Sequence, residues 1–138
     1  MKLMLDTNII VDVLSQRKGY KESLQIVKYC ELGRVDGFVS AITVTDVMYI
    51  LRKHIDPRYV REAVQTLLLI LDVTSVIKSD INHGFLSEMK DYEDAVLSSC
   101  AERIKADYIV TRNISDFKKS AVPAILPGVA LDIISSLR

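Results

Sequence analysis

The sequence has few cysteines, no excess of charge of one sign and no long hydrophobic run. Cys30 and Cys100 match no metal-binding or redox spacing, which predicts two reduced, buried thiols in a cytoplasmic protein. Eighteen basic residues balance eighteen acidic ones, which argues against a strongly basic nucleic-acid-binding protein but leaves a local basic patch open. Residues 67–71, the densest apolar stretch, are too few to cross a bilayer, and Asp6 interrupts the apolar start. We therefore expect neither a membrane span nor a secretory signal.

The chain also lacks repeats, low-complexity tracts and Gly/Ser-rich linkers, which predicts one domain over residues 1–138. The patterns predict strands over residues 2–6, 37–40, 73–77, 107–111 and 124–126, and helices over residues 8–14, 21–32, 41–53, 57–71, 79–89, 92–104 and 128–138. Thr7 is the predicted N-cap of the first helix. Because helices separate the strands, we expect parallel pairing through right-handed crossovers. The predicted fold class is α/β: a three-layer α/β/α sandwich with a parallel sheet of about five strands.

Two aspartates follow predicted strands, at the edge of the sheet where ligands bind in folds of this kind. Asp6 ends the first strand, and Asp116 comes soon after the strand over residues 107–111. Each has a simpler explanation when taken alone. Asp6 could cap the next helix, and Asp116 could belong to a surface turn.

A third aspartate, Asp46, lies on a helix face that is otherwise apolar. Ile42, Asp46 and Ile50 are spaced four residues apart, so on a helix their side chains share one face. A carboxylate is costly to bury there. The alternative is an acid at the edge of the helix that reaches solvent or pairs with Arg52 or Lys53.

A fourth aspartate, Asp94, continues the apolar stripe of the helix predicted over residues 92–104. Asp91 lies near the same face, whereas Glu93 is predicted to point elsewhere. The helix dipole alone favours acids in a first helical turn, which explains Asp91 and Glu93. It does not explain why Asp94 falls on the core stripe.

Four carboxylates that converge at one edge of the sheet would repel one another, and a divalent cation would relieve that repulsion. Oxygen ligands favour Mg²⁺ or Mn²⁺ over zinc. Such a site can activate water and stabilise the departing oxygen of a phosphodiester. Thr7, Thr111 and Asn113 could hold a water or a phosphate oxygen there. Residues that could contact a nucleic-acid backbone, or simply be solvated, are Arg112, Lys118 and Lys119.

Three segments together resemble the signature blocks of PIN (PilT N-terminal) domains. They read LDTNIIVD (residues 5–12), DYEDAV (residues 91–96) and IVTRNISDF (residues 109–117). Each block alone is moderately specific. All three in this order are much more specific, and the resemblance covers nearly the whole chain.

The resemblance implies a Mg²⁺- or Mn²⁺-dependent ribonuclease, and a toxin of a type II toxin–antitoxin pair. It also implies a homodimer that acts on RNA and is silenced by a cognate antitoxin, whose peptide blocks the acidic site. Asp6, Asp94 and Asp116 match the first, third and fourth acids of the family. Asp46 stands where many members have Glu, so this shorter side chain is expected to bind metal directly or through a water. The residues that match as auxiliaries are Asp91, Thr111 and Asn113.

Other functions stay open from the sequence. A PIN-like fold without catalysis would serve as a binding module; the nearly full set of acids argues against that alternative, and the shorter Asp46 keeps it open. An aspartate-based phosphatase also has an acid after its first strand, but its second Asp would fall at Asn8. A phospho-receiver domain needs an acceptor Asp at the end of a middle strand, and residues 74–78 contain none. The apolar helices over residues 20–32 and 57–71 are mostly explained by core packing, although some of their side chains could face a second copy.

Overall fold

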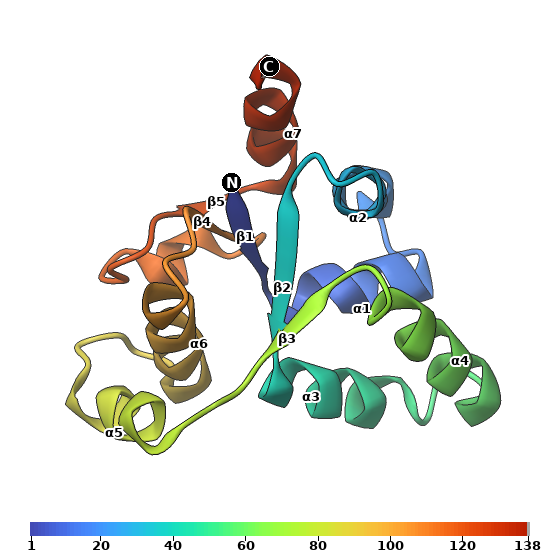
Figure 1. Ribbon diagram of the computed structural model, residues 1–138. Coiled ribbons are helices and arrows are strands. Elements are labelled where there is room, and N and C mark those ends of the chain that lie inside the picture. The colour runs from blue at the N-terminus through green and yellow to red at the C-terminus, as the bar shows by residue number, and fades with distance from the viewer. Residues whose placement is uncertain (138) are drawn as a thin grey trace.

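The computed structural model describes residues 1–137 and contains a five-stranded parallel sheet with helices on both faces (Figure 1). The strands are β1 (Lys2–Leu5), β2 (Asp36–Ser40), β3 (Asp72–Thr74), β4 (Tyr108–Val110) and β5 (Ala124–Ile125). Their order is β3-β2-β1-β4-β5, and every neighbouring pair is parallel. The predicted α/β/α class with about five parallel strands is confirmed.

Helices connect consecutive strands and form two separate apolar cores. They are α1 (Thr7–Ser15), α2 (Tyr20–Glu31), α3 (Ala41–Leu51), α4 (Pro57–Leu67), α5 (Lys78–Leu86), α6 (Tyr92–Arg103), the 3-10 helix η1 (Ile114–Phe117) and α7 (Pro127–Ser136). Leu3 and Leu5 pack with α1 to α4 and α7 on one face, whereas Met4 packs with α6 and Phe117 on the other. This alternation along β1 is what a strand covered on both faces requires.

The first helix begins one residue earlier than predicted, and Thr7 as its N-cap is wrong. Asp6 is the N-cap: its backbone is extended, and its carboxylate accepts a hydrogen bond from the Thr7 N–H at 2.8 Å. Asp is as good an N-cap as Thr, and β1 ends at Leu5, so Asp6 is the first residue free to turn into the helix.

The third strand is shorter than predicted. It pairs with β2 only from Asp72 to Thr74, where Thr74 lies opposite Ser40. Ser40 is the last residue of β2 and the N-cap of α3, so residues 75–77 have no strand beside them. The β-branched pattern of residues 73–77 could not reveal where the neighbouring strand stops.

The last strand is two residues long, but its hydrogen bonds matter for β4. The carbonyl groups of Pro123 and Ile125 accept hydrogen bonds from the N–H groups of Ile109 and Thr111, at 2.9 and 3.0 Å. β5 therefore completes the hydrogen bonding of the strand that leads into Thr111. Both cysteines are buried free thiols, as predicted. Within residues 1–137, every helix is too short or too polar to cross a lipid bilayer.

Candidate functional site

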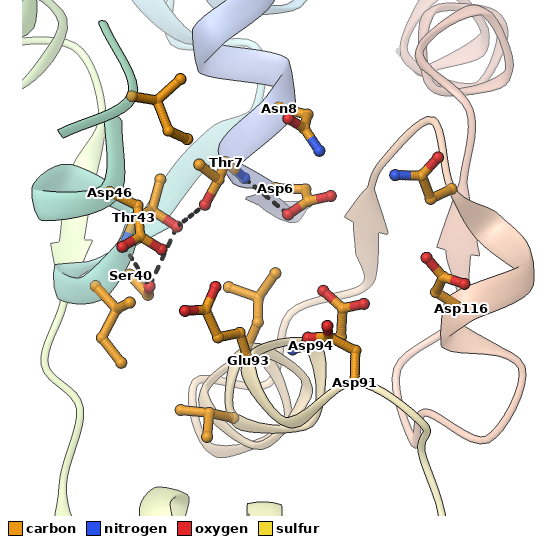
Figure 2. Close-up of a pocket in the computed structure, with 15 residues that line it drawn as sticks. Asp6, Thr7, Asn8, Ser40, Thr43, Asp46, Asp91, Glu93, Asp94 and Asp116 are labelled. Carbon is orange, nitrogen blue, oxygen red and sulfur yellow. Dashed lines mark hydrogen bonds between the residues drawn. The ribbon is translucent and has the colours of Figure 1, made fainter. Parts of the chain in front are cut away.

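A cavity of about 280 Å³ lies beyond the carboxyl ends of the central strands (Figure 2). Six carboxylates line it, from the starts of α1 and α6, the middle of α3, and η1. They belong to Asp6, Asp46, Asp91, Glu93, Asp94 and Asp116. None of the described residues that line the cavity is a lysine, arginine or histidine. The cavity is therefore a site of concentrated negative charge without a protein cation to balance it.

Asp6 is the most enclosed of these acids, with 7% of its surface exposed. Its Oδ1 accepts the Thr7 N–H, and its Oδ2 accepts the hydroxyl of Thr111, both at 2.8 Å. Burial raises the pKa of Asp6, the two hydrogen bonds oppose that rise, and the charges of Asp116 and Asp91 add to it. Asp6 thus caps α1 and also lines the cavity, so the two roles weighed from the sequence coexist.

Asp91 and Asp94 lie together at the start of α6. Asp91 is the N-cap, and its Oδ1 accepts the Asp94 N–H at 3.0 Å. Burial and the charges of Asp91, Asp6, Asp116 and Glu93 raise the pKa of Asp94 to about 7. Mutual repulsion among the acids, expected from the sequence if they converge, is therefore present.

Glu93 lines the cavity as well, and the prediction that it points elsewhere is wrong. In Figure 2 its carboxylate extends from α6 toward Asp46 on α3. The charge of Asp46 is the largest cause that raises the pKa of Glu93, ahead of burial and Asp91. The predicted stripe on α3 holds, since Ile42, Asp46 and Ile50 all line the cavity. Neighbouring positions of the first turn of α6 reach the cavity together, so helical spacing alone could not exclude Glu93.

Hydroxyl groups form a chain along one wall of the cavity. The Oγ1 atoms of Thr7 and Thr43 lie 3.1 Å apart, and the Ser40 hydroxyl donates to Thr43 Oγ1 at 3.2 Å (Figure 2). Thr7 was predicted here, whereas Ser40, Thr43 and Asn8 were missed as site residues. The signal for Ser40 was available, because it ends β2 at the same edge of the sheet as Asp6.

The segment after β4 supplies the opposite wall. Asn113 and Asp116 of this segment line the cavity, and Figure 2 shows Asp116 across the cavity from Thr7. Thr111 is fully buried and reaches the cavity only through its hydrogen bond to Asp6. Two basic side chains near this segment form ion pairs outside the cavity. Arg112 Nε lies 2.9 Å from Asp12 Oδ2, and Lys119 Nζ lies 3.1 Å from Glu88 Oε2.

A family model described as a PIN domain matches residues 2–115. This chain belongs to the PIN domain family. Members of the family are generally nucleases that use divalent metal ions. No curated protein sequence matches the chain significantly.

Solved structures share the fold of this PIN domain at low sequence identity. VapBC2 from Rickettsia felis, bound to a DNA fragment from its promoter, has a chain that is 18% identical, with a TM-score of 0.70 and coverage of 91% of this chain and 98% of that one. A toxin–antitoxin complex from Klebsiella pneumoniae has a chain that is 24% identical, with a TM-score of 0.68 and coverage of 91% and 97%. VapBC-1 from nontypeable Haemophilus influenzae has a chain that is 17% identical, with a TM-score of 0.70 and coverage of 93% and 99%.

The donor set of this PIN domain suits a hard divalent cation. Its cavity offers carboxylate, hydroxyl and amide oxygens, and burial together with the charges of neighbouring acids raises the pKa values of Asp6 and Asp94. Among residues 1–137, no three His, Cys, Asp or Glu side chains are gathered closely enough to hold one ion as they stand. Mg²⁺ usually keeps several waters and needs only one or two carboxylates, so a wide acidic cavity fits it better than it fits zinc.

Proposed function

We propose that this PIN domain is an endoribonuclease that depends on Mg²⁺ or Mn²⁺. The observation that carries the proposal is the cavity lined by six carboxylates and by no basic side chain among the described residues. A divalent ion bound there would activate water and neutralise charge on the phosphodiester. A phosphate could not approach so many carboxylates without that neutralisation.

Each predicted site residue has a role in the proposal. Asp6, Asp94 and Asp116 hold the ion, and Asp46 contributes directly or through a water. Asp91 keeps the start of α6 in place through the Asp94 N–H, and its charge faces the cavity as an auxiliary.

The uncharged residues orient the acids and the substrate. Thr111 fixes the direction of the Asp6 carboxylate. Thr7 and Asn113, which both line the cavity, offer a hydroxyl and an amide to a phosphate oxygen. No side-chain nucleophile is needed, because the proposed reaction is hydrolysis by water.

We further propose that the protein is a toxin, controlled by a cognate antitoxin and acting on RNA in the cytoplasm. The supporting likeness is the fold shared with chains of toxin–antitoxin complexes. A homodimer is also proposed. Leu32 after α2 and Leu69 after α4 are 70% and 88% exposed, which leaves apolar surface on the helices where the sequence suggests a partner.

The test is cleavage of a structured RNA by the purified protein with Mn²⁺, with Mg²⁺ and in excess EDTA. Asp6→Asn removes one charge at nearly constant shape and should abolish cleavage while the fold survives. Asp132→Asn, at an exposed position on α7, is the control and should cleave like the unchanged protein. Full activity of Asp6→Asn, or full activity in EDTA, would contradict the proposal. A folded protein that binds RNA but never cleaves it would support the binding-module alternative.

A further inference from the structure

Asp12 is a buried carboxylate that does not line the acidic cavity. It lies on α1 with 1% of its surface exposed. Arg112 Nη2 donates a hydrogen bond to Asp12 Oδ1 at 3.1 Å, and Arg112 Nε lies 2.9 Å from Asp12 Oδ2. Burial raises the pKa of Asp12, and the charges of Arg112 and Arg17 oppose that rise.

The segment that contains Arg112 is anchored by a buried residue at each end, but the residues between these two anchors make few polar side-chain contacts to the rest of the protein. Thr111 is fully buried and Phe117 is 3% exposed, whereas residues 112–116 are all exposed. In the part of the chain that the structure describes, Arg112 makes the only side-chain hydrogen bond or ion pair from residues 112–116 to another element. Asn113 and Asp116, which line the cavity, belong to this stretch.

We infer that the Asp12–Arg112 pair positions the cavity wall that carries Asn113 and Asp116 against the wall that carries Asp6. This inference rests on the proposed nuclease function. Arg112 lies between Thr111, which binds Asp6, and Asn113, while Asp12 lies on the helix that Asp6 caps. The pair therefore joins two of the segments that line the cavity, the one after β4 and the one after β1.

A purely stabilising role explains the pair less well. Asp12 is buried but Arg112 is 42% exposed, so their attraction does little more than offset the cost of removing the Asp12 carboxylate from water, and the pair contributes little net stability. What it supplies is direction: the planar guanidinium donates one hydrogen bond, from Nη2 to Asp12 Oδ1, and its Nε lies beside Oδ2. Arg112 and Asp12 are thus positioning residues, and neither is placed among the groups that touch the substrate.

The decisive variant is Asp12→Asn, which keeps the shape of the side chain and leaves no buried charge. Arg112 is 42% exposed and can turn to water. Asp80→Asn is the matched control, because Asp80 is also 1% exposed and pairs with Arg103 at 2.9 Å, but it does not line the cavity. Arg112→Lys is the conservative variant, since it keeps the positive charge and loses the planar fork.

Three measurements report on the order of the segment after β4, on metal binding and on catalysis. They are hydrogen–deuterium exchange over residues 112–117, Mn²⁺ affinity by titration calorimetry, and Mn²⁺-dependent RNA cleavage. Asp12→Asn should speed exchange over this segment and weaken Mn²⁺ affinity and cleavage by about 10- to 100-fold, as loss of an outer positioning contact does at metal sites. Arg112→Lys should retain more of all three properties than Asp12→Asn. Asp80→Asn should leave them unchanged, even where its melting temperature falls.

Two results would overturn the inference: unchanged exchange in Asp12→Asn, or faster exchange with Mn²⁺ affinity and cleavage unchanged. Failure of the proposed function is separable, because it would show as an unaltered protein that neither binds Mn²⁺ nor cleaves RNA. In that case faster exchange in Asp12→Asn would still support the positioning of the wall, and unchanged exchange would refute it.

Discussion

The hydroxyl of Thr111 donates a 2.8 Å hydrogen bond to Oδ2 of Asp6 and so joins the segments that follow β4 and β1. The backbone supports the same contact, since the Asp6 N–H donates to the Val110 carbonyl at 3.0 Å. The pairing of β1 with β4 therefore brings the side chains of Asp6 and Thr111 together, and the Thr111 hydroxyl fixes the orientation of the Asp6 carboxylate. This contact leads to the first of four predictions.

Thr111→Val should remove that hydrogen bond at nearly constant volume. We expect the pKa of Asp6 to rise further, because a donor to its charged form is lost. The free energy of unfolding near pH 7 should fall by about 1.5–3 kcal/mol, the usual contribution of a hydrogen bond to a charged group. Cleavage should fall by about 10- to 100-fold. Urea unfolding, carboxylate NMR and the RNA assay measure these three effects.

The control for this variant is Thr74→Val. Thr74 is 5% exposed, and its hydroxyl has no hydrogen-bond partner among the described residues. Its replacement should leave stability unchanged or raise it by about 1 kcal/mol, because a desolvated polar group is removed. Equal destabilisation by both variants would show that the Thr111–Asp6 hydrogen bond does not contribute to the free energy of unfolding.

The stability of the metal-free protein should fall as the pH rises from about 4 to about 7. Burial and the surrounding charges raise the pKa of Asp94 to about 7, whereas an unfolded aspartate titrates near pH 4. The native state therefore binds the extra proton over this range, and raising the pH favours unfolding. Asp94→Asn should flatten this dependence in EDTA, and Asp132→Asn should not. Parallel curves of unfolding free energy against pH for the two variants would contradict the prediction.

The Asp80–Arg103 pair should show the opposite dependence on pH. Burial raises the pKa of Asp80, but hydrogen bonds from Arg103, the Ile77 N–H and Ser99 together hold it below its usual range. Its contribution is therefore complete above about pH 4, where an unfolded aspartate is ionised, and is lost as the pH falls through the lowered native pKa. Asp80→Asn should cost about 1.5–3 kcal/mol at pH 7 and progressively less in acid. A cost that stays constant down to pH 2 would argue against an ionic contribution.

The sequence alone was sufficient for the α/β class and the five parallel strands, though not for their order, and it singled out five of the six carboxylates that line the cavity. Buried strands ending in polar residues mark the carboxyl edge, so Asp6 and Asp116 could be assigned to it before any coordinates. Asp46 was recognised because a carboxylate on an apolar stripe needs a reason to be there.

The remaining features depend on contacts between distant segments. Glu93 reaches the cavity because α3 places Asp46 opposite the first turn of α6, and no periodicity encodes that distance. The sequence left Arg112 as either a contact to nucleic acid or a solvated surface cation, yet its partner lies 100 residues earlier, on α1. The sequence explained Asp91 either by the helix dipole or as an auxiliary of the site, and the structure shows that it caps α6 and lines the cavity.

The two-residue strand β5 sets a limit on how far this protein can be shortened. A fragment ending at residue 115, where the family match stops, would lose the carbonyl groups of Pro123 and Ile125. Ile109 and Thr111 would then present unpaired N–H groups at a bare sheet edge, a surface that invites intermolecular strand pairing. Expression of that fragment should yield aggregates, so deletion mapping of the active region has to keep the chain at least through β5.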